Sequence, residues 1–368
     1  MTAKARPLAQ RVRRTALVVA VNLVLTLALV EIALRVQQAL GPLYDLDVNK
    51  DAIAFGLSDE LNHTFLPSEI EWDADGIRRM RVPNAARCAP KLLFMGDSFM
   101  QGLGIDDTIP VHVRFYFHEV LHREICAVNA GASSYSPSIY VPQAEKLIPK
   151  IKPDVVVIDV DETDLWDDYY RYRQLVVRDR SGSIVAVKRT PLAEGFREGL
   201  AAAGKKPLYL QRLFAKLYFT RIAYPRLSAE YRRNMEQDGF WVSRAPVAEA
   251  RQRYGAAIAY FGATLQDLTE VVTRLMGGAQ GLVYIHHPHL ENLRTGGDAF
   301  NTVVSDTIRE VAARNHVRYY DATDDLKVQF GTSPESYYIP NDMHFNERGL
   351  QAYSLAVAKY LAGAIPGD

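Results

Sequence analysis

The sequence has few cysteines and no excess of charge of either sign. Only Cys88 and Cys126 occur in 368 residues, and two cysteines do not form a metal-binding cluster. Lysine plus arginine and aspartate plus glutamate both number 43, so the formal net charge is zero. A nucleic-acid-binding protein would be expected to carry a basic excess. Internal repeats and low-complexity tracts are also missing, which leaves an ordinary globular composition with a large core available.

Charge is missing altogether from one stretch near the N-terminus. Residues 15–30 are uncharged, and the apolar character resumes after Glu31 as far as Leu34, which is about the length that a membrane-spanning helix needs. Helices of soluble proteins rarely lack a polar face over that length. A cleaved signal peptide is the alternative, but residues 31–39 show no convincing small-x-small cleavage site. We therefore predict a transmembrane signal anchor at residues 15–35.

Basic residues before this segment predict its orientation. The positive-inside rule places residues 1–14 in the cytoplasm as a basic tail, because they include Lys4, Arg6, Arg11, Arg13 and Arg14. The protein is then a single-pass protein of the cytoplasmic (inner) membrane. Its main domain is periplasmic or extracellular, and the membrane is the first predicted partner.

From residue 91 onward, strand-like apolar runs alternate with helical patterns. Strands are predicted at residues 91–95, 125–129, 154–160, 281–286 and 317–321. Helices are predicted at residues 109–122, 138–148, 247–276, 298–315 and 347–361. This alternation predicts an α/β fold, a five-stranded parallel sheet covered by helices on both faces.

The two cysteines lie beside the first two of these strands. Cys88 precedes the first strand and Cys126 opens the second. An exported domain permits a disulfide. The offsets of the two residues along their strands differ by several residues, so a bridge would require Pro90 to bend the chain. A disulfide and two separate buried thiols are both compatible with the sequence, and the offset favours the thiols.

The other segments show weaker patterns. Residues 36–70 are predicted to be a connector, and within residues 71–81 an Asp-Gly pair indicates a surface hairpin or turn. Residues 169–244 form an insertion in the domain at residues 71–368. In it, residues 174–188 are predicted to form a hairpin, and residues 208–227 an amphipathic helix with basic residues. That helix could pack on the core, act as a lid or contact the membrane, and packing is the commonest role.

A glycine-flanked Asp97-Ser98 follows the first predicted strand. Gly96 lets the backbone bend, so Ser98 is presented at the carboxyl end of the strand, where open parallel sheets bind ligands. By itself this is ordinary turn chemistry. The block GDSFMQG nevertheless resembles the GDS block of the SGNH (GDSL-type) esterases and acyltransferases, with Ser98 at the nucleophile position. The resemblance covers roughly residues 71–361 and implies a flavodoxin-like three-layer sandwich, the SGNH hydrolase fold.

A second block supplies a base and a group to orient it. Residues two apart in an extended turn point the same way, so Asp342 can hold the ring of His344 toward Ser98. With Asn346 and Gly349 they form D-x-H-x-N-x-x-G, which resembles the last SGNH block. A helix-capping turn beside a surface histidine is the alternative, but the chain order Ser, Asp, His favours a triad. One residue between Asp and His is the form associated with the membrane-anchored, polysaccharide-modifying branch.

The developing oxyanion needs hydrogen-bond donors. The resemblance implies the backbone N–H groups of Ser98 and Gly131, the latter in the second block, and an asparagine side chain in the third. Here Thr163-Asp164 occupies that position. A threonine hydroxyl can donate but is shorter and rotates more freely than an amide. Because losing one such donor typically costs about a hundred-fold in rate, this departure weakens the prediction of efficient hydrolysis.

Further residues after the strands are candidates for contacting substrate: Asp97, Asn129, Tyr135, Asp164 and His286. The aromatic residues nearby could stack on sugar rings, although core packing is their usual role: Tyr135, Trp166, Tyr169 and Tyr170.

Two clusters invite a metal. Acidic residues at 159–168 could hold a hard cation, but we expect them to be partly solvated, with some pairing to Arg171 or Arg173. The YIHHPH run suggests zinc, yet adjacent histidines on a strand point to opposite faces, and no cysteine or carboxylate completes the set locally. We predict no metal and no cofactor, and one histidine lining the substrate cleft.

The sequence thus predicts a membrane-anchored SGNH-type serine esterase or O-acyltransferase acting on acyl esters, acetyl being favoured, of an extracytoplasmic polysaccharide or envelope glycan. With water as acceptor the enzyme is an esterase. With a sugar hydroxyl it is a transferase that would work with a membrane-bound acyl-donor protein. The alternative is a non-catalytic glycan-binding or assembly protein that retains the fold, for which Thr163 is the only hint.

Overall fold

The computed structural model describes residues 8–40, 55–81, 83–85, 88–189, 208–218, 246–294, 300–340 and 342–365. By its contacts the chain divides into two compact units. One consists of Met1–Ile53 with Pro191–Glu230, and the other of Ala54–Thr190 with Tyr231–Asp368. The second unit holds the predicted sheet and every predicted site residue.

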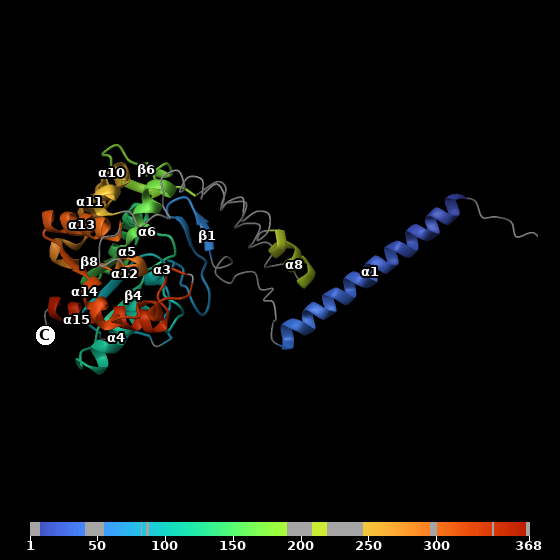
Figure 1. Ribbon diagram of the computed structural model, residues 1–368, viewed down its shortest axis with the longest axis horizontal. Coiled ribbons are helices and arrows are strands. Elements are labelled where there is room, and N and C mark those ends of the chain that lie inside the picture. The colour runs from blue at the N-terminus through green and yellow to red at the C-terminus, as the bar shows by residue number, and fades with distance from the viewer. Residues whose placement is uncertain are drawn as a thin grey trace, which may run out of the picture. The chain divides into compact units, whose positions relative to one another are not determined.

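The second unit is built on one parallel sheet of five strands (Figure 1). Its order is β4-β3-β5-β8-β9, which in chain order of these strands is 2-1-3-4-5, the flavodoxin-like order. The strands are β3 (Lys91–Met95), β4 (Cys126–Asn129), β5 (Val155–Asp159), β8 (Leu282–His286) and β9 (Arg318–Asp321). All five strands and the predicted fold are confirmed, each strand within two residues of its predicted ends.

Helices cover both faces because alternate strand residues point to opposite sides. Leu93 and Val156 belong to one core cluster, and Leu92 and Val157 belong to the other. The first cluster is covered by α5 (Pro137–Ile151), α11 (Gly255–Met276) and α13 (Phe300–Arg314). The second is covered by α4 (Ile109–Glu119), α14 (Thr323–Phe330) and α15 (Glu347–Ala364). Figure 1 shows α11 and α13 on one side of the sheet and α4 and α15 on the other.

One predicted helix is two helices. The pattern over residues 247–276 breaks at Tyr254, which separates α10 (Val247–Arg253) from α11. The break leaves the Tyr254 ring buried, with edge contacts to Trp166 at 5.1 Å and Phe300 at 5.3 Å between ring centroids. Long-range aromatic packing therefore overrides the helical period. Short elements that the sequence did not indicate are α3 (Ser98–Gln101), α6 (Glu162–Trp166), the π-helix η1 (Asp167–Tyr172), η3 (Ala279–Gly281), α12 (Leu290–Arg294) and η4 (Pro334–Tyr337).

The predicted connector is partly folded, which corrects its featureless description. Within it, β1 (Phe55–Ser58) and β2 (Asn62–Phe65) pair as an antiparallel hairpin in the second unit. The ring of Phe65 stacks on Trp72 with centroids 3.4 Å apart, so burial of this pair holds the hairpin down. The predicted turn follows it, where an Asp73 side-chain oxygen accepts hydrogen bonds from the backbone of Asp75 and Ile77.

Cys88 and Cys126 form a disulfide, so the expectation of two separate thiols was wrong. Their Cα atoms are 5.1 Å apart. The chain before β3 runs beside β4, because the Asn84 side chain pairs with both the N–H and the C=O of Ala127 at 3.0 and 2.9 Å. We expected the two sulfurs to lie apart because the cysteines stand at different positions along their strands. The path of the chain before β3 removes that difference and brings Cys88 beside Cys126.

The insertion contains the predicted hairpin, formed by β6 (Val176–Arg178) and β7 (Ile184–Val187). The predicted amphipathic helix is present as α8 (Tyr209–Tyr218), and residues 219–227 of that prediction lie outside the described residues. Within the first unit α8 contacts the N-terminal helix, where Glu31 accepts hydrogen bonds from the backbone of Tyr209 at 3.1 Å and Leu210 at 2.8 Å. The role of α8 among the three that the sequence left open therefore stays a prediction.

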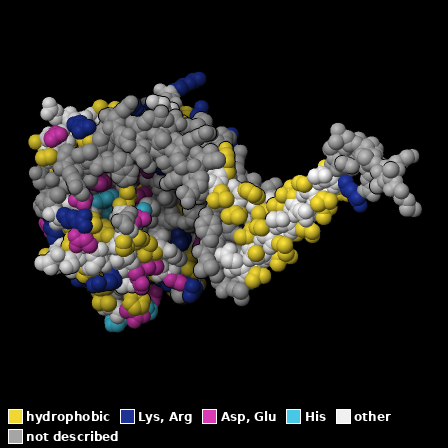
Figure 2. All heavy atoms as spheres, turned by 45° about the vertical axis from the view of Figure 1, so that its right-hand side comes forward, with side chains coloured by type: hydrophobic (Ala, Val, Ile, Leu, Met, Phe, Trp, Pro, Cys, Tyr) yellow, Lys and Arg dark blue, Asp and Glu magenta, His cyan; other side chains and the backbone are white. Residues whose placement is uncertain are grey.

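The N-terminal helix α1 (Leu8–Leu40) contains the predicted span. An 18-residue window within Arg13–Gln37 has a mean hydropathy of 2.6, and none of that window is buried inside the structure. Apolar side chains cover the helix (Figure 2). By length and composition α1 is a candidate membrane span.

Candidate active site

Ser98 begins the short helix α3 at the carboxyl end of β3. Gly96 is required in the intervening turn, since a Cβ there would lie 2.7 Å from Met100 Cβ. The Asp97 side chain caps the helix by accepting a hydrogen bond from Phe99 N at 2.8 Å. Ser98 is partly exposed, while its neighbours Asp97 and Phe99 are buried. The local sequence thus presents one hydroxyl at the sheet edge.

The structure joins the three predicted catalytic residues in one hydrogen-bonded chain. Ser98 Oγ lies 2.7 Å from His344 Nε2, and His344 Nδ1 lies 2.5 Å from Asp342 Oδ1. The same carboxylate oxygen accepts a hydrogen bond from the backbone N–H of His344 at 3.0 Å. Since the carboxylate accepts from Nδ1–H, the Nε2 lone pair faces the serine, which is the geometry that a general base needs.

The loop that carries this pair is held by the start of α15. Asn346 caps the helix, its Oδ1 accepting a hydrogen bond from Gly349 N at 3.1 Å. A Cβ on Gly349 would lie 2.1 Å from the carbonyl oxygen of Tyr337, so only glycine allows the helix to begin there. Burial works against ionisation of Asp342, but the hydrogen bonds from His344 outweigh it and hold the pKa of this carboxyl below its usual value. Asp342 is therefore charged at neutral pH.

The three predicted oxyanion donors differ in the hydrogen bonds that they already make. The Ser98 N–H lies in the first turn of α3, where helical N–H groups lack an intrahelical partner. The Gly131 N–H donates to Asn129 Oδ1 at 2.9 Å. The Gly131 backbone lies against α3, since a Cβ there would lie 2.6 Å from Gln101 N. An oxyanion would have to compete with Asn129 for this N–H.

The Thr163 hydroxyl lies between two carboxyl groups. Its Oγ1 is 2.6 Å from Asp161 Oδ1 and 3.2 Å from Asp97 Oδ2. A hydroxyl has one proton, and in this geometry the proton is directed to a carboxyl group. Its role as an oxyanion donor stays a prediction.

Asp97, a predicted substrate contact, is buried beside the nucleophile, with Oδ2 3.3 Å from Ser98 Oγ. Burial, and then the negative charge of Asp161, raise the pKa of Asp97 to about 8. The carboxyl is therefore largely neutral at pH 7. A neutral group here avoids placing a second negative charge where an oxyanion would develop.

The other four predicted substrate contacts are each buried and bonded within the protein, so their contact with substrate stays a prediction. Asn129 Nδ2 donates to Met100 O at 3.0 Å, and the Tyr135 hydroxyl donates to His63 O at 2.5 Å. Asp164 accepts hydrogen bonds from the Tyr140 hydroxyl and from Asp161 N. His286 Nδ1 lies 2.7 Å from Val160 O on the covered side of the sheet. Position after a strand was the signal for these four, and it does not distinguish the cleft from the core.

The aromatic residues that could stack on sugar rings differ in their exposure. Trp166 is buried against Tyr254 and Phe300, which is core packing, whereas Tyr169 and Tyr170 keep partial exposure. Arg173 does not pair with the acidic residues as expected, and its guanidinium lies 4.0 Å from the centroid of the Tyr169 ring.

The acidic residues after β5 are buried rather than partly solvated, which is a further correction. Asp159, Asp161, Asp164 and Asp168 are each at most 2% exposed. Of the expected pairs with arginine, the structure has Asp167 with Arg171 at 3.5 Å.

Asp167 gives this cluster a testable dependence on pH. Burial outweighs the attraction of Arg171 and raises the pKa of Asp167 from 3.8 to about 6. Between these values the folded chain holds a proton that the unfolded chain has lost, so Asp167 makes the free energy of unfolding fall as pH rises from about 4 to about 6. Asparagine does not titrate. Asp167→Asn is expected to remove about 3 kcal/mol of this fall, measured by urea unfolding of the full chain in detergent at several pH values.

Asp59→Asn, at a carboxylate 73% exposed, is the control, and its free energy of unfolding should change with pH as in the wild type. The same dependence on pH in Asp167→Asn would contradict the expectation.

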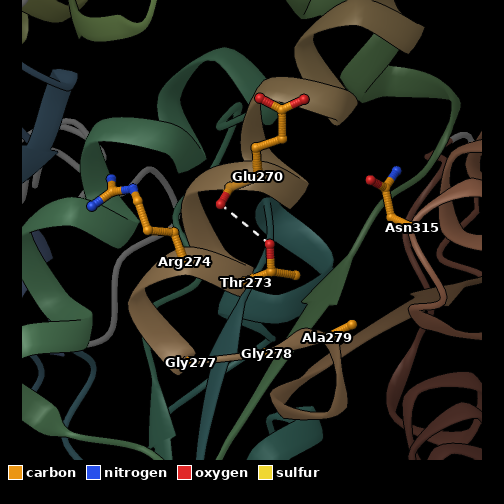
Figure 3. A pocket seen from close by; sticks show the side chains of 7 residues that line it. All are labelled: Glu270, Thr273, Arg274, Gly277, Gly278, Ala279 and Asn315. Carbon is orange, nitrogen blue, oxygen red and sulfur yellow. Dashed lines mark hydrogen bonds between the residues drawn. The ribbon is translucent and has the colours of Figure 1, made fainter.

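A separate surface hollow lies at the other end of the sheet (Figure 3). It is lined by Glu270, Thr273, Arg274, Gly277, Gly278, Ala279 and Asn315. Six of these residues lie at the end of α11 and just before β8 begins, and Asn315 lies between α13 and β9, whereas Ser98 follows the end of β3. Because the strands are parallel, this hollow is not part of the Ser98 site.

Comparison with known proteins gives likenesses in structure alone, since no family model and no curated protein matches the chain. It is similar to a lipase/acylhydrolase from Enterococcus faecalis, with 13% identity, TM-score 0.41 and coverage of 76% of this chain and 99% of that one. It is also similar to a catalytic mutant of Axe2, an acetylxylan esterase from Geobacillus stearothermophilus, with 14% identity, TM-score 0.44 and coverage of 78% and 98%. A third is a two-domain esterase active on acetylated mannans, with 14% identity, TM-score 0.40 and coverage of 76% and 50%.

The strand order and the positions of the site residues along the chain describe the fold and its candidate site. Ser98 follows the first strand of the sheet, and Asp342 and His344 precede the last helix. The chain thus has a flavodoxin-like α/β fold, and its three predicted catalytic residues lie at the positions that the resemblance of its sequence blocks to SGNH enzymes implied. At TM-scores below 0.5 these likenesses carry no argument about substrate, so the function has to be argued from the residues of the site.

Proposed function

We propose that the protein is a membrane-anchored serine esterase or O-acyltransferase that acts on acyl esters, acetyl being favoured, of an extracytoplasmic glycan. The observation that carries the proposal is the chain of hydrogen bonds from Ser98 through His344 to Asp342, at 2.7 and 2.5 Å. A serine hydroxyl is a weak nucleophile until a base takes its proton, and this chain supplies the base and fixes its orientation.

In the first half-reaction, Ser98 Oγ attacks the ester carbonyl carbon while its proton passes to His344 Nε2. The carbonyl oxygen becomes an oxyanion, for which the N–H groups of Ser98 and Gly131 and the hydroxyl of Thr163 are the proposed donors. The alcohol leaves with the proton from His344, and the acyl group remains on Ser98. Asp342 keeps its charge throughout and stabilises the imidazolium.

In the second half-reaction, His344 takes a proton from the acceptor, which attacks the acyl group, and then returns that proton to Ser98. Water as acceptor releases the free acid, and a sugar hydroxyl yields a new ester. The site is open, since the side chains of Asp342 and His344 are 44% and 32% exposed. An open site supports a bulky glycan as substrate or acceptor, and the D-x-H spacing supports the same choice by resemblance.

The anchor is the remaining part of the proposal. Arg13 and Arg14 sit at the start of the apolar stretch of α1, which supports an N-terminus in the cytoplasm and a catalytic domain on the periplasmic or extracellular side. An acyl-donor protein in the same membrane would be the partner of a transferase.

Covalent labelling tests the proposal on the full chain in detergent. A fluorophosphonate reacts with serines that a neighbouring base activates, so we expect one adduct, placed on Ser98 by peptide mass spectrometry, and none in Ser98→Ala. Labelled acetyl ester supplied with manno- or xylo-oligosaccharides then separates the two outcomes of the acyl-enzyme, free acetate or acetylated sugar. Absence of an adduct on Ser98 would favour the non-catalytic glycan-binding alternative.

A further inference from the structure

A second group of reactive side chains lies beyond the triad, at the ends of two neighbouring strands. Asp161 follows β5, and His287 and His289 follow β8. One ligand atom from each of the three lies within 4.8 Å of the other two, and all three residues are buried. The sequence did not indicate that Asp161 joins the histidines, because it is 126 residues before His287 and only the sheet brings them together.

The ring nitrogens of the two histidines are arranged alike. Both Nε2 atoms face Asp161 Oδ2, at 3.3 Å from His287 and 2.7 Å from His289. Both Nδ1 atoms face another carboxylate, Asp159 at 3.2 Å for His287 and Glu162 at 3.5 Å for His289. Histidines that bind a metal through one ring nitrogen usually donate from the other to a carboxylate or carbonyl, which fixes the tautomer. His287 makes such a hydrogen bond to Asp159, and the Glu162 carboxylate lies on the corresponding side of the His289 ring.

Two further observations point to a cation site. His287 is 1% exposed, and its Nε2 has no hydrogen-bond partner although Asp161 Oδ2 lies 3.3 Å away. Asp159 Oδ2 is likewise buried without a hydrogen bond. In the described part of the chain, the ion pairs of Asp159, Asp161 and Glu162 are all with these two histidines. The buried carboxylates of Asp159 and Asp161 and the partly buried one of Glu162 outnumber the two imidazoles, and a divalent cation would balance that negative charge.

We propose that Asp161, His287 and His289 bind a Zn²⁺ ion. Zinc takes imidazole nitrogen and carboxylate oxygen at about 2.0–2.2 Å, so the ligand atoms of a tetrahedral site lie about 3.3 Å apart. The 3.3 Å between Asp161 Oδ2 and His287 Nε2 fits this spacing. His289 Nε2, 2.7 Å from the same oxygen, would have to withdraw by about half an ångström. Nitrogen ligands disfavour magnesium and calcium, which prefer oxygen.

The ion would act on the Ser98 site through Asp161. While Oδ2 faces the histidines, Oδ1 accepts hydrogen bonds from Thr163 N at 2.8 Å and from the Thr163 hydroxyl at 2.6 Å. A metal on Oδ2 therefore fixes the loop that holds Thr163 against Asp97. The zinc is a structural ion beside the site and takes no part in the acyl transfer, so its presence can be tested without an activity assay.

Metal binding is measured on the full chain in detergent after stripping with EDTA. We expect the wild type to take up one zinc per chain by elemental mass spectrometry, and its melting temperature to rise when zinc is added. His289→Gln, which keeps a donor toward Asp161, is expected to bind zinc at least a hundred-fold more weakly in competition with a chromogenic chelator and to lose the rise in melting temperature. His118→Gln, at an exposed histidine that pairs with Glu124, is the matched control and should bind like the wild type.

A second variant keeps the proposal falsifiable if His289→Gln fails to fold. Glu162→Gln leaves all three ligands and removes the carboxylate behind His289, so we expect a loss of about ten- to a hundred-fold in affinity. Cobalt(II) in place of zinc should give the intense visible bands of a four-coordinate site in the wild type and not in His289→Gln. The proposal is overturned if the stripped wild type takes up no zinc, or if His289→Gln and Glu162→Gln both bind it as tightly as His118→Gln.

Discussion

Ser98→Ala is expected to lower kcat/KM for p-nitrophenyl acetate by about 10⁴-fold or more, while the melting temperature changes little. The alanine cannot form the acyl-enzyme, and His344 Nε2 loses the hydroxyl that lies 2.7 Å away. Knocking out a triad serine leaves only the catalysis that the oxyanion donors and substrate binding provide. Stability should hold because Ser98 is partly exposed and α3 is capped by Asp97. Steady-state kinetics of the full chain in detergent measure the effect.

Ser133→Ala is the matched control for this substitution. Ser133 is a partly exposed serine in the loop after β4, on the same edge of the sheet, and its replacement should leave kcat/KM within about two-fold of the wild type. If Ser98→Ala kept a tenth or more of wild-type activity, another nucleophile would be responsible. The hydrogen-bonded chain would then be a structural feature and the proposed function would fail.

The fold was predictable because its signals are local. β5 is buried along its whole length, which is why VVVIDV is a nearly continuous apolar run, and each strand is followed by a helical period. The meeting of the three proposed catalytic residues was predictable for a related reason. Ser98, Asp342 and His344 each stand at a sequence block that resembles a known one, and the strand order then determines that the blocks meet.

What could not be predicted depends on pairings between distant residues. The disulfide required the path of the chain at Asn84 beside β4, which no periodic pattern encodes. The approach of Asp161 to His287 and His289 required the pairing of β5 with β8. Tyr135 was assigned to the cleft because it follows a strand, and its burial arises from packing against the β1–β2 hairpin, which the sequence did not reveal.

The hydrogen bonds of the predicted oxyanion donors could not be predicted from the sequence either. The backbone N–H of Gly131 was predicted from a sequence block, but its bond to Asn129 was not. Neither was the position of the Thr163 hydroxyl between Asp97 and Asp161. Two of the three predicted donors are therefore engaged within the protein. If acyl transfer occurs, either these bonds rearrange as the oxyanion forms or the Ser98 N–H bears most of the stabilisation.

Asp342→Asn is the second substitution with a large expected effect, a fall in kcat of about 10³-fold with KM little changed. Asp342 Oδ1 accepts hydrogen bonds from both the backbone N–H and the ring Nδ1–H of His344. An asparagine that offers its NH₂ group to Nδ1 would move the ring proton to Nε2, so that Ser98 would face a donor instead of a base. An asparagine that offers its oxygen would keep the tautomer but lose the charge that stabilises the imidazolium.

Steady-state kinetics on p-nitrophenyl acetate separate these effects from substrate binding. A fall in kcat at constant KM assigns Asp342 to an interaction made in the transition state. Asp106→Asn, at an exposed carboxylate that pairs with Arg81, is the control and should behave as the wild type. A loss of less than ten-fold in Asp342→Asn would mean that His344 is held in its working tautomer by something other than this carboxylate. A change confined to KM would place Asp342 in substrate binding instead of the triad.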